Sequence, residues 1–106
     1  MPDFWQQHLD KQEVDSVSQA IGDGYQPDLK RVFRAIDKPA RQIKVLILGQ
    51  DPYPNSDHAT GLAFSVPKNC RQLPASLKNI YQELQSDINI KRDTGDLSDW
   101  ADQGVM

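Results

Sequence analysis

Residues 43–49 read IKVLILG, and this stretch decides the fold. It is an almost unbroken run of Ile, Val and Leu, interrupted by a single lysine. Such runs are typical of strands that are buried on both faces near the middle of a parallel sheet. We therefore expect a central strand over residues 43–48, with strand neighbours on both edges and a layer on each face.

Helical patterns surround this strand. Apolar residues recur at the spacing of a helix face in five segments, and we expect helices there: residues 4–9, 14–21, 29–36, 76–85 and 97–101. Gly22 ends the second of these segments and Gly104 ends the last. The segment GLAFSV, residues 61–66, is a candidate short strand, and residues 104–106 read as the opening of another apolar strand.

The predicted architecture is incomplete as it stands. Residues 62–66 are the one candidate partner for the strand at residues 43–48, and an uncertain one. Two readings follow from this. The chain is the N-terminal part of a larger α/β domain, with residues 1–106 as a single incomplete domain, or it is a small α+β domain with a frayed tail. We favour the first.

Composition excludes several classes of protein. The chain of 106 residues has room for one small domain with a thin core. Its first residues have no signal-peptide pattern, and no apolar run could span a membrane. Cys70 is the only cysteine, which excludes an internal disulfide and an iron–sulfur cluster. We expect a cytoplasmic protein. The net charge of −3 argues mildly against a nucleic-acid partner, although net charge is not local charge.

The residues that follow the strand form the candidate site. Ligands of open α/β sheets bind at the carboxyl ends of strands, and that position holds GQDPYP, residues 49–54. Asp51 is expected at the rim of the sheet, in a loop that Pro52 and Pro54 stiffen. The alternative is that Asp51 only caps a turn or helix, which is a common role of aspartate.

Four segments carry a family resemblance. Residues 45–53, VLILGQDPY, resemble the water-activating motif of family-1 uracil-DNA glycosylases. Residues 61–66, 73–81 and 95–106 resemble, in the same order, the family's base-stacking segment, its proline-serine loop with the following helix, and the stretch before its next strand. The resemblance implies a three-layer α/β/α fold with a central parallel sheet. This chain would supply its N-terminal helices, first strand and following loops.

The same resemblance implies the chemistry. The family hydrolyses the N-glycosidic bond of uracil in DNA, after the base has been flipped out of the helix, as a step of base excision repair. Asp51 matches the catalytic carboxylate that positions the attacking water and stabilises the cationic sugar. Gln50 matches the residue whose backbone N–H binds a uracil carbonyl. Tyr53 matches the ring beside C5 of the base, where it would exclude the methyl group of thymine.

Three further residues match substrate-binding positions. Phe64 matches the ring on which uracil stacks, the alternative being plain core packing. Pro74 and Ser76 match the loop that grips a DNA phosphate, the alternative for Ser76 being an ordinary N-cap. The resemblance implies no metal and no cofactor, uracil-containing DNA as the partner, and a monomer. His58 lies in the same loop as the motif, but the family assigns this position no catalytic role.

The chain also departs from the family. Pro54 stands where many relatives have histidine, and Ala75 where a second proline is frequent. The family's uracil-reading asparagine is expected just after Met106, and its catalytic histidine and leucine wedge later still. We therefore expect the 106-residue chain alone to be weakly active or inactive. Other readings are a noncatalytic module that binds DNA or protein, an iron–sulfur glycosylase, disfavoured by Cys70 and the motif, and a nucleotide binder, which lacks a glycine-rich loop.

Overall fold

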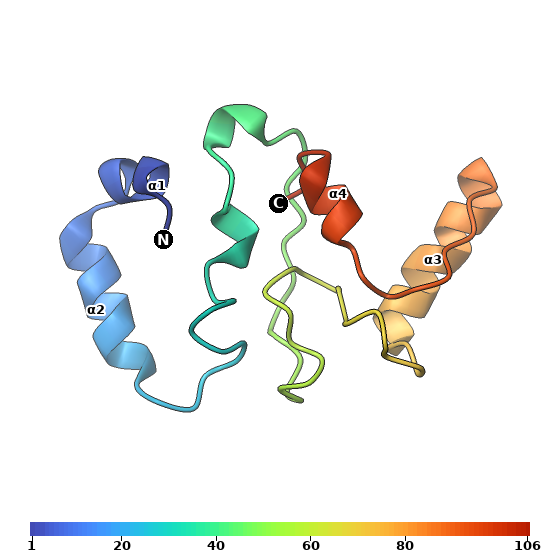
Figure 1. Ribbon diagram of the computed structural model, residues 1–106, viewed down its shortest axis with the longest axis horizontal. Helices are drawn as coiled ribbons and strands as arrows, with labels where there is room; N and C mark the ends of the chain where they lie inside the picture. Colours follow the sequence, from blue (N-terminus) through green and yellow to red (C-terminus); the bar gives the residue numbers. More distant parts are fainter.

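Residues 43–49 run as extended chain through the middle of the molecule, with helices on either side (Figure 1). The computed structural model describes all residues from Met1 to Met106 and measures 45 × 32 × 20 Å. Four α-helices and two short 3₁₀ helices follow one another along the chain: α1 (Asp3–His8), α2 (Lys11–Ile21), η1 (Arg34–Ile36), η2 (Ala40–Gln42), α3 (Ala75–Ile88) and α4 (Ser98–Asp102).

The central segment pairs with the C-terminal residues in parallel. Val45 and Val105 form a parallel β-bridge. The N–H of Met106 donates to the carbonyl of Val45 at 2.8 Å, and the N–H of Ile47 donates to the carbonyl of Met106 at 2.6 Å. The predicted parallel pairing is therefore present as a single bridge at Val105. Gly104 lies in a turn with a φ of +99°, so the expected strand at residues 104–106 is reduced to this bridge.

The prediction that this segment is a buried central strand is wrong for the chain as it stands. Val45 is 50% exposed, Leu46 61% and Leu48 86%. The reason is that one edge is paired only at the bridge to Val105, and no layer covers these side chains. These residues consequently form no sheet and no three-layer arrangement.

Two other expected elements differ. Residues 29–36 form turns followed by η1 instead of a continuous helix. Residues 61–66 are not a strand, because Gly61 and Phe64 have φ values of +84° and +63°, which bend the chain. The bend presses Gly61 against the turn before η1: a Cβ at Gly61 would lie 2.2 Å from the carbonyl oxygen of Arg31. Packing between distant segments thus overrides the local strand pattern.

The four remaining helices are confirmed. The Asp10 carboxylate caps α2 by accepting the N–H groups of Gln12 and Glu13, and Gly22 ends it with a φ of +58°. The apolar face of α2 stays exposed, with Val17 61% accessible. Helix α3 extends to Ile88, three residues beyond the predicted end, and stops at Asn89 in the left-handed conformation.

The core lies between α3, α4 and the loop that precedes α3. Val66, Leu77 and Leu97 are buried at its centre. Six partly buried side chains pack around them: Tyr53, Phe64, Cys70, Leu73, Tyr81 and Trp100. Only 9 of the 106 residues are buried, so the core is as thin as the length predicts. Because Tyr53 and Phe64 belong to this shell, the core also fixes the loops that hold the candidate site.

Ser65 links the loop to α4 from inside the core. Its side chain is completely buried, and its Oγ accepts the backbone N–H of Leu97 at 3.0 Å. Replacing Ser65 by alanine leaves this N–H buried without a partner. We expect Ser65→Ala to lower the free energy of unfolding by about 1–3 kcal/mol, measured by urea denaturation. Ser18→Ala, which removes an exposed hydroxyl from α2, is the control and should leave the midpoint unchanged. Equal midpoints for both variants would contradict the prediction.

Candidate functional site

A cleft of about 450 Å³ lies where residues 45–48 end. Its walls come from parts of the sequence that are far apart: the turns at residues 26–32, the loop at 49–53, the segment at 59–64 and the start of α3. Five of the six side chains predicted for the site line this cleft: Gln50, Asp51, Tyr53, Phe64 and Ser76. The sixth, Pro74, lines a neighbouring cavity instead.

The Asp51 carboxylate is exposed at the cleft. Its Oδ2 accepts a hydrogen bond from the side-chain amide of Gln50 at 3.0 Å and from no backbone N–H. Asp10 and Asp96, by contrast, do accept backbone N–H groups of the following residues. The capping interpretation of Asp51 is therefore wrong, and its carboxylate is available to solvent and to a ligand. The backbone N–H of Gln50 is likewise unpaired within the chain.

Tyr53 and Phe64 are held together at the cleft wall. The Tyr53 hydroxyl donates to the carbonyl of Phe64 at 3.0 Å. Phe64 has a φ of +63°, a conformation that is uncommon for a residue with a side chain. The Phe64 ring packs against the core cluster and also borders the cleft. Phe64 therefore packs against the core and lines the cleft at the same time, so the two interpretations of this residue do not exclude each other.

The start of α3 has no side-chain cap. Its N-cap is Pro74, and no side chain accepts a hydrogen bond from its first turn. Ser76 is the second residue of the helix and is exposed, so the prediction that it could serve as the N-cap is wrong. Ser76 borders the cleft, and the backbone N–H groups of Ala75 and Ser76 have no hydrogen-bond partner within the chain.

Several residues at the site were not found from the sequence. Gln26, Pro27 and Thr60 also line the cleft. The His58 ring lies edge-on to Tyr53, with 6.2 Å between ring centroids, and its Nε2 lies 3.6 Å from Cys70 Sγ. The sequence indicates the turn at Gln26 and Pro27 and assigns His58 no role, whereas nothing in it marks Thr60. That these residues lie near one another depends on contacts between distant segments.

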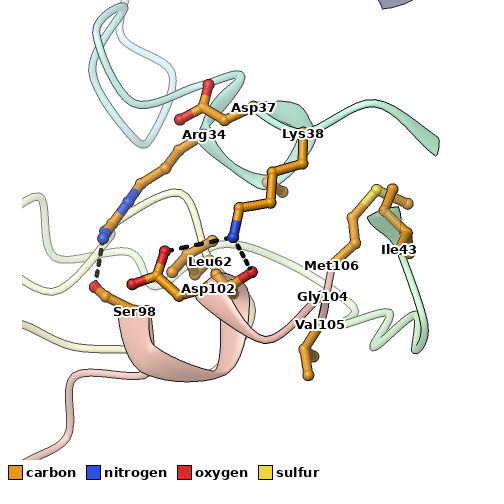
Figure 2. A pocket seen from close by; sticks show the side chains of 12 residues that line it. Arg34, Asp37, Lys38, Ile43, Leu62, Ser98, Asp102, Gly104, Val105 and Met106 are labelled. Carbon is orange, nitrogen blue, oxygen red and sulfur yellow. Dashed lines mark hydrogen bonds and ion pairs between the residues drawn. The ribbon is translucent and has the colours of Figure 1, made fainter. Parts of the chain in front are cut away.

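A second cavity, of about 250 Å³, joins the N-terminal half of the chain to α4 (Figure 2). Arg34 donates to Ser98 Oγ at 2.6 Å and to the carbonyl of Thr60 at 3.1 Å. Lys38 Nζ donates to the carbonyl of Ala101 at 2.7 Å and lies 3.4 Å from an Asp102 carboxylate oxygen. Both cations bind other groups of the protein, so the contacts around this cavity join the N-terminal half of the chain to α4. Because Arg34 also binds the carbonyl of Thr60, which lines the cleft, these contacts support the cleft as well.

An ion pair between Arg92 and Asp99 holds α4 to the segment after α3. The guanidinium makes two hydrogen bonds to the Asp99 carboxylate, at 2.8 and 2.7 Å, and lies over the rings of Tyr81 and Trp100. The hydrogen bonds from Arg92 lower the pKa of Asp99. Burial alone would raise the pKa of Asp96, yet hydrogen bonds from the hydroxyl and N–H of Ser98 bring it below its usual value.

These shifts predict a loss of stability in acid. A carboxylate whose pKa is lowered by folding stabilises the folded chain above its unfolded pKa of about 3.9, and this stabilisation is lost as the pH falls through the lowered value. We expect the urea midpoint to fall as the pH drops below about 4. Asp99→Asn should make the midpoint fall less steeply with pH, because only the contribution of Asp96 then remains. A midpoint of Asp99→Asn that declines as steeply as that of the unsubstituted chain would contradict this role.

The structure contains neither a metal-binding cluster nor a helix that could span a membrane. No three side chains of His, Cys, Asp or Glu gather closely enough to hold a metal ion. None of the helices combines the length and the apolar character that a membrane span requires.

Known proteins resemble this chain in sequence. No protein-family model matches it. The uracil-DNA glycosylase of Nocardioides sp. is 51% identical over 88 residues, which is 82% of this chain and 38% of the relative. The uracil-DNA glycosylase of Chlamydia muridarum is 54% identical over 81 residues, 76% of this chain and 35% of the relative. That of Campylobacter jejuni is 46% identical over 100 residues, 92% of this chain and 42% of the relative.

Solved structures resemble it in fold. The crystal structure of mimivirus uracil-DNA glycosylase matches with a TM-score of 0.70 and 40% identity, over 76% of this chain and 32% of that one. A mimivirus UNG variant in complex with UGI matches with a TM-score of 0.76 and 33% identity, over 97% of this chain and 43% of that one. The chain spans about two fifths of the length of the curated relatives it matches. In sequence and in fold, which is α/β in these relatives, it corresponds to the N-terminal portion of the uracil-DNA glycosylases.

Proposed function

We propose that this chain contributes the water-activating part of a uracil-DNA glycosylase active site, and that the whole protein excises uracil from DNA. The observation that carries the proposal is the convergence of Gln50, Asp51, Tyr53, Phe64 and Ser76 on one cleft. These residues come from three separate segments, each of which resembles a different segment of the family. Chance similarity in a single motif would not bring them together.

Asp51 is the proposed catalytic carboxylate. Departure of the base leaves positive charge on the sugar, and a nearby anion stabilises the transition state in which that charge develops. The Asp51 carboxylate is suited to this task because its one hydrogen bond comes from a side-chain amide and leaves the rest of the group free. In this proposal the same carboxylate positions the water that attacks the sugar, with no metal and no cofactor.

Tyr53, Phe64 and Gln50 form the proposed contacts with the flipped base. Phe64 offers a ring face for stacking, a contact worth about 1–3 kcal/mol per base in comparable systems. Tyr53, held by its hydrogen bond to the Phe64 carbonyl, is the proposed wall beside C5 of uracil that excludes thymine. The unpaired backbone N–H of Gln50 is the proposed donor to a uracil carbonyl.

Pro74 and Ser76 are the proposed phosphate contacts at the rim. Ser76 borders the cleft and Pro74 borders the adjacent cavity, so a DNA strand would cross the start of α3 between the two. A hydroxyl and free N–H groups at a helix N-terminus suit a phosphate oxygen. The partner is then uracil-containing DNA.

Several broader properties follow from the same relationship and are part of the proposal. Residues 1–106 belong to a single domain, incomplete by itself, with a three-layer α/β/α architecture and a central parallel sheet. The exposed side chains of Val45, Leu46 and Leu48 would be covered in that sheet. The protein acts as a cytoplasmic monomer.

A chimera tests the proposed activity. This chain replaces the matching 100 residues of the Campylobacter jejuni relative, with which it shares 46% identity. We expect the chimera to release uracil from a uracil-containing duplex and to leave a matched thymine duplex intact. The 106-residue chain alone should release little or none. A chimera that folds, as judged by circular dichroism, and releases no uracil would overturn the proposal and favour the noncatalytic binding module.

A further inference from the structure

Two cavities lie along α3, beside the proposed cleft. The first, of about 600 Å³, borders Pro74, Ala75 and Arg71 at the start of the helix. The second, of about 460 Å³, lies between the middle of α3 and the segment that follows it, beside Lys91 and Arg92. Leu73 and Lys78 line both, so the two cavities are neighbours on the same face of α3, and we term them together the α3 groove.

The α3 groove is positively charged in a chain that is acidic as a whole. The sequence contains 15 Asp and Glu residues, and none of them lines either cavity. Arg92 is occupied by its ion pair with Asp99. The three other cations of the groove, Arg71, Lys78 and Lys91, are exposed and take part in none of the ion pairs of the structure.

The exposed cations of this groove suit a chain of phosphates. Unpaired lysine and arginine side chains attract the phosphodiester backbone, which gains free energy from the release of condensed counterions. The side chains of Gln72, Gln82 and Ser86 add polar groups that can hydrogen-bond to phosphate and sugar oxygens. The groove begins at Pro74, next to the proposed phosphate contact of Ser76, so a single strand can reach both.

We propose that the α3 groove binds the sugar-phosphate backbone of DNA through Arg71, Lys78 and Lys91, beyond the phosphate that Pro74 and Ser76 hold. The inference rests on the proposed function, because that function brings the DNA strand to the start of α3. It adds a second, sequence-independent contact surface to the one at the cleft. Contacts of this kind set affinity and register and carry no information about the base.

The salt dependence of DNA binding tests the groove. Binding of a fluorescent duplex to the 106-residue chain is measured over a series of NaCl concentrations. The double variant Lys78→Ala/Lys91→Ala should reduce the slope of log K against log salt by about 2, since each lost phosphate contact contributes about 0.9. Uracil-containing and matched thymine-containing duplexes should lose affinity to the same extent. Lys11→Ala is the control, because Lys11 is exposed on α2, away from the groove, and is in no ion pair.

The outcomes separate the groove from the proposed function. Three results would overturn the proposal that the α3 groove binds DNA. They are an unchanged slope in the double variant, an equal loss of slope in Lys11→Ala, and no DNA binding at the lowest salt. If the chimera excises uracil while the double variant keeps its slope, the glycosylase proposal stands and the proposal that the groove binds DNA fails. If the double variant loses slope while the chimera releases no uracil, the groove stands and the glycosylase proposal fails.

Discussion

Asp51→Asn is expected to slow uracil release by the chimera by about 100- to 1,000-fold, the cost of removing one preorganised electrostatic contact to a transition state. Asparagine has the shape of aspartate and can still accept a hydrogen bond from the Gln50 amide, so the loop should keep its geometry. What the variant lacks is the negative charge that offsets the developing positive charge on the sugar. The measurement is single-turnover release of uracil, which separates chemistry from product release.

Asp57→Asn provides a matched control for this variant. Asp57 is an exposed carboxylate in the same loop but does not line the cleft. Its loss should therefore leave the single-turnover rate unchanged. Binding of the uracil duplex should change little in either variant, since the two carboxylates are not proposed to hold the DNA. An Asp51→Asn chimera that releases uracil as fast as the Asp57→Asn chimera would remove Asp51 from the catalytic role.

Gly95→Ala is expected to destabilise the fold by about 1–3 kcal/mol, the usual cost of forcing an extra carbon into a packed core. Gly95 is buried against the core cluster, and a Cβ there would lie 2.3 Å from Val66 Cγ2 and 2.7 Å from Leu73 Cδ2. Val66 is completely buried and β-branched, so its side chain has little freedom to move away. The clash would also strain the hydrogen bond from the Val66 N–H to the Gly95 carbonyl, at 2.9 Å.

Urea denaturation at neutral pH measures this effect, with Gly49→Ala as the control. A Cβ at Gly49 meets only the Cβ of Ala63, at an ordinary distance of 3.8 Å, and the backbone there is not in the left-handed region. Gly49→Ala should therefore unfold close to the midpoint of the unsubstituted chain. A Gly95→Ala midpoint equal to that of Gly49→Ala would mean that the core around Val66 is loose enough to adapt.

The four α-helices were predictable because their signals are local. The apolar spacing of α3, the glycine after α2 and the short apolar face of α4 each depend on residues within one or two helical turns. Residues 61–66 failed as a strand for the opposite reason. Their bend is set by the contact of Gly61 with the carbonyl of Arg31, thirty positions away, and no local pattern encodes that contact.

The candidate site divides in the same way. The position after the apolar segment indicated Asp51, and the family resemblance added Tyr53, Phe64 and Ser76 to the same site. All four residues line one cleft. Asp51, Phe64 and Ser76 each also had a structural interpretation, as a cap or as part of the core. Only the three-dimensional contacts show which interpretation holds. Asp51 caps nothing and Ser76 is not the N-cap of α3, whereas Phe64 packs on the core and lines the cleft at once.

The sequence by itself determined the order of the four α-helices and the extended apolar segment at residues 43–48, because these depend on short-range spacing. The site residues follow from the family resemblance and remain a proposal. Only the tertiary structure decided how exposed Val45 and Leu48 are, since burial depends on what packs against a side chain. It also revealed the α3 groove. A net charge of −3 conceals a cationic surface when the acidic side chains lie elsewhere, and their distribution is fixed by folding.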